Sequence, residues 1–248
     1  MEPVASGAAN YAHVSTGNSW AYAAKEAAVT RGAGVISSVT VSPTRLSVGY
    51  EFASEDVALL GNLEDVLRRD MRMSFTAKVN DAVLNNATAT DGFDGLLAEL
   101  TAPAALQSGD AEETYASYLA KLAGYVDGKY AGSLMGLSVL FGSAGYAHFA
   151  SRVATAGYAD GATLASKLQG VRASGHMPGI TSKGAVAIVR VGSDPGAVAI
   201  PVWDSMSLIR DPYTASAKAV VALTAHALWN MSVIRQAHLK QRIFKVQA

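Results

Sequence analysis

Seven apolar side chains recur three or four residues apart between positions 60 and 83, and this stripe restricts the fold more than any other feature. They are Leu60, Leu63, Leu67, Met71, Phe75, Val79 and Val83. The spacing places all seven on one face of an α-helix, which leaves the remaining faces polar. A helix with a single apolar face lies on a sheet and is not enclosed by a core, so the stripe predicts a helix packed on a sheet.

The predicted helix is long. Ser54 is a candidate N-cap, and Glu55 and Asp56 stand in the first turn, where the helix dipole favours acidic side chains. The polar residues 85–92 predict its end, and Gly61 is expected to fray or bend its start. Roughly thirty residues at ~1.5 Å each give a rod of about 45 Å, whereas helices in globular proteins average about 11–12 residues.

Period-two alternation predicts strands on both sides of this helix. Before it, residues 39–41 and 46–52 alternate apolar with polar or small side chains, which predicts two short strands around Pro43. After it, residues 198–202 and 206–210 predict two further short strands, followed by a turn.

The longest alternation covers residues 221–233. Its apolar face consists of Val221, Leu223, Ala225, Ala227, Trp229, Met231 and Val233. Val220, Ala222 and Leu228 blur the pattern, so an alanine-rich helix stays open as the alternative. We favour a strand because β-branched residues fall on the alternation.

Residues 93–197 have the pattern of a separate compact lobe. A helix is predicted over residues 111–130, with one apolar face formed by Tyr115, Leu119, Leu122 and Val126. Further helical turns are expected near residues 145–156 and at 162–168. A strand is predicted at residues 185–191, with glycine-rich turns on both sides.

Residues 1–34 are rich in Gly, Ala, Ser and Thr, and Trp20 and Tyr22 stand out in that background. Such a segment cannot bury enough apolar surface to fold by itself. We expect an extended arm or a mobile loop that becomes ordered against something else.

Composition excludes several classes of protein. Half of the 248 residues are apolar and 16% are charged, against about 25% charged in ordinary domains. This excludes a disordered chain and indicates surface that another molecule covers. The absence of cysteine excludes a disulfide scaffold, a thiolate zinc site and a cysteine nucleophile. No secretory signal and no membrane-spanning stretch is visible, so we expect a soluble protein kept in a cytoplasm-like compartment.

The net charge is zero, but the charges are unevenly distributed. Residues 51–130 carry 14 acidic and 6 basic side chains, and residues 131–248 carry 11 basic and 4 acidic. Two explanations stay open: solvated faces arranged by chance, or acidic and basic surfaces of neighbouring copies that meet head to tail. The basic residues Arg235, Lys240, Arg242 and Lys245 lack interleaved aromatic side chains, so they are a weak signal for nucleic-acid binding.

The sequence offers no catalytic constellation. Histidines stand at positions 13, 148, 176, 226 and 238, and no two have the spacing that places metal ligands on one helical face. The closest approach to a nucleophile elbow, residues 132–136, has its serine one place too early. We therefore predict no catalytic, cofactor-binding or metal-binding residue, no cofactor, and a protein that is not an enzyme.

Two blocks of sequence are distinctive within this order of elements. The first comprises residues 41–43, 61–69 and 83–97, the last of which reads VLNNATATDGFDGLL. The second comprises residues 177–178, 202–212 and 237–240. The first block resembles the spine helix and its exit, and the second the final strands, of the major capsid proteins of tailed bacteriophages, the Hong Kong 97-type family.

The resemblance implies an α+β fold of Hong Kong 97 type in four parts. These are an N-terminal arm (1–14), an extended β-loop (15–50), a peripheral domain with the spine helix and long strands (51–95 and 198–248), and an axial domain (96–197). The implied function is a structural head protein that self-assembles, through hexamers and pentamers, into an icosahedral shell around double-stranded DNA. Implied partners are other copies, separate scaffold, portal and decoration proteins, and DNA contacted non-specifically, with no membrane. The implied location is the virion, with assembly in the bacterial cytoplasm.

Two features of that family are not carried over. Many relatives begin with a helical scaffolding segment that a protease removes, and none is visible after Met1. We therefore expect either a separate scaffold or a start that is not the primary translation product. Some relatives crosslink a loop lysine to a neighbour's asparagine with the help of a glutamate. Lys25 lies in the loop region, but residues 219–235 contain no glutamate.

Two alternatives remain. An encapsulin-like shell, which encloses enzymes and not a genome, would share the fold. A two-lobed α/β hydrolase or binding module would be a different class, and it would run as a monomer or small oligomer.

Overall fold

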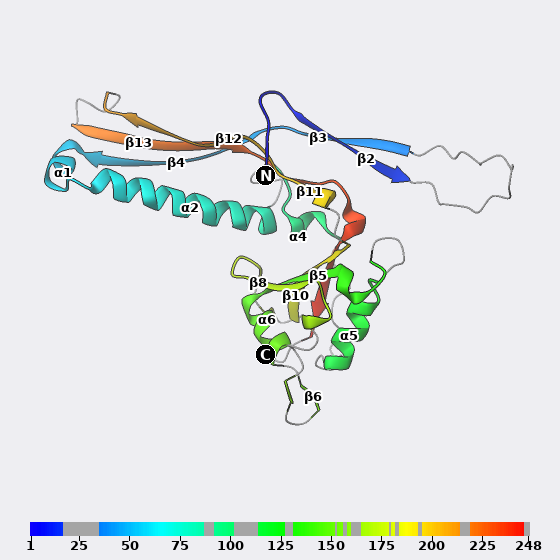
Figure 1. Ribbon diagram of the computed structural model, residues 1–248. Helices are drawn as coiled ribbons and strands as arrows, with labels where there is room; N and C mark the ends of the chain where they lie inside the picture. The colour runs from blue at the N-terminus through cyan, green and yellow to red at the C-terminus, as the bar shows by residue number, and fades with distance from the viewer. Residues whose placement is uncertain are drawn as a thin grey trace.

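The computed structural model has two lobes, and a two-stranded ribbon extends from the upper one (Figure 1). The structure describes residues 1–16, 35–86, 92–101, 114–126, 131–151, 153–155, 158–159, 165–178, 180–181, 184–192, 195–213 and 219–245. Trp20, Tyr22 and Lys25 lie outside these ranges. Helices and strands are mixed in both lobes, which confirms the predicted α+β class.

The upper lobe is a four-stranded sheet with two helices along one face (Figure 1). In spatial order the strands are β1 (Glu2–Pro3), β12 (Pro201–Asp211), β13 (Val220–Trp229) and β4 (Thr44–Ala53). The helices are α1 (Ser54–Leu59) and α2 (Leu63–Asn85). β13 pairs antiparallel with both of its neighbours, and β1 pairs parallel with β12.

The long helix is broken near its start and is shorter than predicted. Residues 60–62 separate α1 from α2, so the uninterrupted helix has 23 residues and spans about 35 Å. Gly61, a poor helix former, lies in the break, and Leu60, which was expected in the buried stripe, is exposed. Ser54 is not an N-cap: it is the first residue of α1, and Ala53, which has no side-chain oxygen, takes the cap position.

From Leu67 to Val83 the stripe packs on the sheet as predicted. Met71 is fully buried in a cluster with Leu223 and Ala225 of β13. About two helical turns further along α2, Val79 packs with Trp229 in a second cluster. Burial of each large apolar side chain contributes about 1.5–3 kcal/mol, so this helix–sheet interface holds the upper lobe together.

The strand predicted for residues 221–233 is confirmed over Val220–Trp229, which excludes the alanine-rich helix. Buried and partly exposed residues alternate strictly along β13. β13 ends at Trp229, and β14 (Ser232–Val233) then pairs with β11 (Val198–Ala199). The two short strands expected at 198–202 and 206–210 are instead β11 and one long strand, β12, whose register shifts on both sides of Asp204.

The lower lobe contains a second sheet, and its two helices pack on the same face of it. Its strands are β15 (Leu239–Phe244), β10 (Gly184–Val191), β5 (Leu137–Gly142) and β8 (Gly170–Ser174), with β9 (Ile180–Thr181) also paired to β10. The helices are α5 (Tyr115–Ala123) and α6 (Ser143–Ala150), with the short elements η1 (Leu134–Gly136), β6 (Val153–Thr155) and β7 (Tyr158–Ala159) nearby.

The core of the lower lobe is aromatic. Tyr118 of α5 stacks on Phe244 of β15, with ring centroids 4.6 Å apart, and meets Phe149 of α6 edge to face. Phe141 of β5 completes this fully buried group. Aromatic pairs of this kind contribute about 0.5–1.5 kcal/mol beyond the area they bury. These four rings therefore fix both helices and the C-terminal strand to one sheet.

Sequence patterns predict the helices and β10 of this lobe better than its other strands. The helix expected at 111–130 is confirmed over Tyr115–Ala123, and residues 111–113 and 127–130 lie outside the described residues. The helical turns expected at 145–156 end at Ala150, and β6 follows. Those expected at 162–168 are described only from residue 165. β5 was missed because its sequence, LSVLFG, has a single polar residue and shows no sustained apolar–polar alternation, although buried and partly exposed residues alternate along most of the strand.

The C-terminal strand belongs to the sheet of the lower lobe. β15 pairs with β10 from Arg190↔Leu239 to Ala185↔Phe244. The buried end residues of β15 explain this placement, because Phe244 completes the aromatic core of the lower lobe. The four expected domain boundaries stay a prediction.

A small apolar junction connects the lobes after α2. It comprises α4 (Leu96–Glu99), η2 (Pro195–Ala197) and η4 (Gln236–His238). Leu84 at the end of α2 packs here with Leu100, Ile188 and Leu239. Residues from both lobes therefore share one cluster, which fixes the C-terminal end of α2 against the lower lobe.

Gly95 lies in this junction and leaves no room for a side chain. A Cβ atom there would come within 2.6 Å of the Asn86 N and 2.9 Å of the Ala82 O. Because these are backbone atoms that cannot rotate away, Gly95→Ala is expected to lower the free energy of unfolding by about 1–3 kcal/mol. Gly61→Ala is the control, since a Cβ at Gly61 meets nothing within 4 Å. Urea unfolding followed by circular dichroism measures both, and equal midpoints would contradict the expectation.

Candidate assembly surfaces

The described residues contain no group of three His, Asp or Glu side chains that could hold a metal ion. The histidines are distributed over the ribbon and both lobes. His148 Nδ1 lies 3.1 Å from the Tyr118 hydroxyl, and His238 Nδ1 lies 3.1 Å from the Val191 carbonyl oxygen. Within the described ranges no helix has the length and apolarity to cross a membrane.

The ribbon consists of β2 (Ala9–Thr16) and β3 (Val35–Val41), and it extends well beyond the sheet (Figure 1). Ala9 and Val41, which pair at its root, are buried. Further out, Val14 pairs with Ile36, and both are exposed, Ile36 to 72%. A two-stranded ribbon is at best marginally stable by itself. Contact with a partner surface would bury the exposed apolar side chains on the outer part of the ribbon.

Tyr11 of the ribbon is tied to the N-terminal strand. Burial raises the pKa of the Tyr11 hydroxyl, and a hydrogen bond to Glu2 and the charge of Glu2 raise it further. The Glu2 N–H in turn donates to the Ile200 carbonyl at 3.0 Å, at the edge of β12. The root of the ribbon is therefore anchored on the upper lobe.

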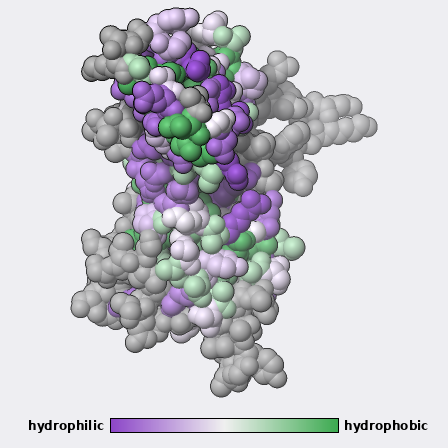
Figure 2. Space-filling view, turned by 90° about the vertical axis from the view of Figure 1, so that its left-hand side faces the viewer, coloured by the Kyte–Doolittle hydropathy of each residue, from purple (hydrophilic) through white to green (hydrophobic). Residues whose placement is uncertain are grey.

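The opposite end of the upper lobe also exposes large apolar side chains. Leu59 at the end of α1 is 80% exposed, and Tyr213 just after β12 is 82% exposed. Leu60 and Ile209 lie at the same end and are exposed as well. Figure 2 faces this side of the molecule and shows hydrophobic surface interrupted by hydrophilic side chains. We name this region the tip, defined by Leu59, Leu60, Ile209 and Tyr213.

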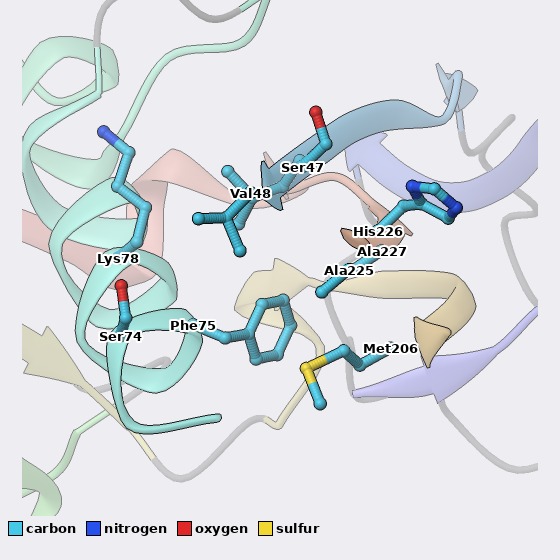
Figure 3. Close-up of a pocket in the computed structure, with 10 residues that line it drawn as sticks. Ser47, Val48, Ser74, Phe75, Lys78, Met206, Ala225, His226 and Ala227 are labelled. Carbon is cyan, nitrogen blue, oxygen red and sulfur yellow. The ribbon is translucent and has the colours of Figure 1, made fainter. Parts of the chain in front are cut away.

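A groove of about 310 Å³ lies between α2 and the sheet. Figure 3 shows Phe75 and Met206 on one side of the space, Val48 on the other and Lys78 at its edge. The space exists because β13 presents short side chains, such as Ala225, beneath Phe75. Phe75 is therefore only half-buried, although the sequence stripe places it at the centre of the helix face.

Two acidic side chains of α2 have partners inside the upper lobe. Glu64 lies 2.6 Å from Arg68 and 3.5 Å from Arg210 of β12. The Tyr50 hydroxyl donates to Asp70 at 2.5 Å, and this hydrogen bond, together with the charge of Asp70, raises the pKa of Tyr50. Exposed pairs of this kind contribute little stability, about 0–1 kcal/mol each. The helix therefore does not form the uniform negative face that the charge excess of residues 51–130 would allow.

The basic C-terminal segment lies in the lower lobe. Lys240 and Arg242 are on β15, Lys245 follows it, and Arg235 precedes η4. The segment is thus separated from the helices of the upper lobe. The head-to-tail contact of oppositely charged surfaces stays a prediction.

Sequence patterns did not indicate the ribbon pairing or the tip. The ribbon joins residues 9–16 with 35–41, and the intervening residues 17–34 lie outside the described ranges. Leu60 was expected to be buried because it continues the apolar stripe. The glycine next to it was the available signal that the stripe is interrupted there.

No protein-family model and no curated sequence matches the chain. Solved structures match it in fold. The capsid of an empty GTA particle aligns with a TM-score of 0.74 at 16% identity, over 98% of this chain and 87% of that one. The capsid of Myoviridae phage XM1 aligns with a TM-score of 0.63 at 11% identity, over 96% and 85%. The holo-SrpI encapsulin complex of Synechococcus elongatus PCC 7942 aligns with a TM-score of 0.61 at 11% identity, over 99% and 87%.

These alignments span both lobes and the ribbon, and they confirm the fold predicted from the two sequence blocks. The sequence identities are low, so the agreement lies in the order and arrangement of the elements. On this evidence the chain has the Hong Kong 97-type fold of tailed-phage capsid proteins.

Proposed function

We propose that this chain is the major capsid protein of a tailed-phage-type particle, a structural subunit that assembles with its own copies into a closed shell around double-stranded DNA. The observation that carries the proposal is the alignment of 98% of the chain with the capsid of a GTA particle at a TM-score of 0.74. A shell subunit needs contact surfaces and no reactive centre, and the described residues provide surfaces.

The distribution of exposed apolar residues supports this function. The outer part of the ribbon and the tip lie at opposite ends of the upper lobe (Figure 1). Two different surfaces at opposite ends suit heterologous contacts, which close into rings when the rotation between copies allows. In this arrangement the ribbon of one copy lies across its neighbour, where its apolar residues become buried.

The proposal includes the remaining partners and the location. Hexamers and pentamers of the chain form the icosahedral shell in the virion, after assembly in the bacterial cytoplasm. Scaffold, portal and decoration proteins are separate chains. DNA is contacted through its phosphates without sequence preference, which a neutral subunit permits because strong basic patches would retain DNA during packaging.

An encapsulin-like compartment is the second candidate, because one of the aligned structures is an encapsulin. Nuclease treatment of particles isolated from the cells that encode the chain separates the two functions. A capsid is expected to protect double-stranded DNA until the shell is opened. Particles that contain a protein cargo and no nuclease-resistant DNA would contradict the capsid proposal and support the compartment.

A further inference from the structure

The ribbon leaves the upper lobe at two neighbouring points. Gly7 precedes β2 and has a φ of +74°, a conformation that glycine adopts without strain. Ser42 follows β3, just before the sheet strand β4 begins. Between these points the root pair of Ala9 and Val41 is buried, whereas the outer residues of the ribbon are exposed. The direction of the ribbon is therefore decided at its root.

Asn230 is hydrogen-bonded to the second of these points, at Ser42. It is 7% exposed and stands where β13 ends. Its Nδ2 donates to the Ser42 carbonyl and lies 3.3 Å from the Thr44 Oγ1, while its Oδ1 accepts from the Met231 N–H at 2.6 Å. Its backbone N–H donates to the Pro201 carbonyl at 3.2 Å. One buried side chain thus joins the end of β13 to the short segment between the ribbon and β4.

Trp203 is hydrogen-bonded to the first point, at Gly7. Its Nε1–H donates to the Gly7 carbonyl at 2.6 Å. Val202 pairs with Trp229 and Asp204 pairs with Leu228, so Trp203 is the extra residue of a register shift in β12. Such irregularities redirect a side chain out of the regular alternation. The shift gives Trp203 its approach to the ribbon.

The two side chains act at the same place. Val202 pairs with Trp229. Trp203 directly follows Val202, and Asn230 directly follows Trp229. Each donates one hydrogen bond to a backbone carbonyl at one root of the ribbon. Because carbonyls are the acceptors, these bonds do not use ribbon side chains, which stay available to a partner.

We propose that Trp203 and Asn230 are positioning residues that together form a clamp, which sets the angle between ribbon and upper lobe and thereby the geometry of assembly. The clamp is a property of the isolated subunit. Its effect on assembly rests on the proposed function, because only in a shell subunit does the ribbon angle determine the contacts with neighbouring copies.

The test measures the ribbon angle directly. The chain has no cysteine, so spin labels can be attached at Ser38→Cys on β3 and Ala77→Cys on α2, both exposed positions. Electron–electron double resonance on dissociated subunits gives the distribution of distances between the labels. A narrow distribution is expected for the parent chain. Trp203→Phe removes the Nε1–H and keeps a ring, and Asn230→Asp removes the donating amide and keeps the size.

Each variant is expected to broaden the distance distribution while the circular dichroism spectrum stays unchanged. The subunit concentration at which half of the protein is assembled should rise about tenfold, which corresponds to the loss of one hydrogen bond. Thr40→Ala is the matched control, because it removes the 2.6 Å bond from Thr40 to Asn10 within the ribbon and leaves the root intact. This control is expected to keep the narrow distribution.

The outcomes separate the clamp from the proposed function. A narrow distribution in both clamp variants overturns the clamp, and Trp203→Phe alone decides this if Asn230→Asp does not fold. A broad distribution with unchanged assembly overturns the link between angle and assembly. If the parent chain never assembles, the proposed function fails, whereas the distance measurement on the subunit still decides the clamp.

Discussion

Replacement of Met71 by aspartate is expected to abolish the folded upper lobe. The Met71 side chain is fully buried between α2 and β13, in a cluster with Leu223 and Ala225. Aspartate removes that apolar contact and leaves a carboxylate without a partner, at a combined cost on the order of 5 kcal/mol or more. Domains of this kind have a total stability of about 5–15 kcal/mol. Urea unfolding and the yield of soluble protein measure the effect.

Met73→Asp is the matched control for this prediction. Met73 lies two residues further along the same helix and is 64% exposed, so the substitution is expected to change the free energy of unfolding by less than about 0.5 kcal/mol. If Met71→Asp and Met73→Asp unfold at the same urea concentration, the orientation of α2 on the sheet is wrong. Phe75 is a weaker probe, because it lines the groove and a carboxylate there could reach water.

The double substitution Val35→Asp with Ile36→Asp is expected to abolish assembly and leave the subunit folded. Both side chains are exposed on β3, so charges there cost the isolated subunit little. In a shell contact the same charges would be buried without partners. The cost of several kcal/mol per contact corresponds to a loss of at least about a hundredfold in assembly affinity. Light scattering during assembly measures the loss.

Ser38→Asp is the control for charge alone. Ser38 is two residues from Ile36, so both lie on the same exposed face of β3, but Ser38 has no apolar side chain to lose. Ser38→Asp is expected to reduce assembly much less than the double substitution. Normal assembly by the Val35→Asp and Ile36→Asp variant would show that the outer ribbon is not a contact surface.

The periodic parts of this fold could be predicted because their signal is local. The stripe from Leu63 to Val83 and the alternation from Val221 to Trp229 each report one buried face, and these two faces meet in the structure. Gly61 was recognised as a weak point of the helix, but the pattern could not show that the helix stops there. Whether a chain bends or breaks at glycine depends on what packs on either side.

The features missed from the sequence depend on long-range contacts. The sequence of β5 has a single polar residue, so its apolar run does not distinguish a strand from a buried helix. β15 is placed by Phe244, whose aromatic partners lie more than 90 residues earlier in the chain. Trp203 and Asn230 bond to backbone carbonyls 196 and 188 residues away. Every residue has a backbone carbonyl, so the sequence does not show which residues accept these hydrogen bonds.

Electron micrographs of the purified chain test most directly whether it is a shell subunit. The protein is imaged across a range of concentrations, with the Val35→Asp and Ile36→Asp variant prepared in parallel. We expect closed, uniform particles from the parent chain, together with separate capsomers or subunits from the variant. A parent chain that stays a monomer or small oligomer at every concentration, with the ribbon folded and assembly conditions varied, would contradict the proposed function.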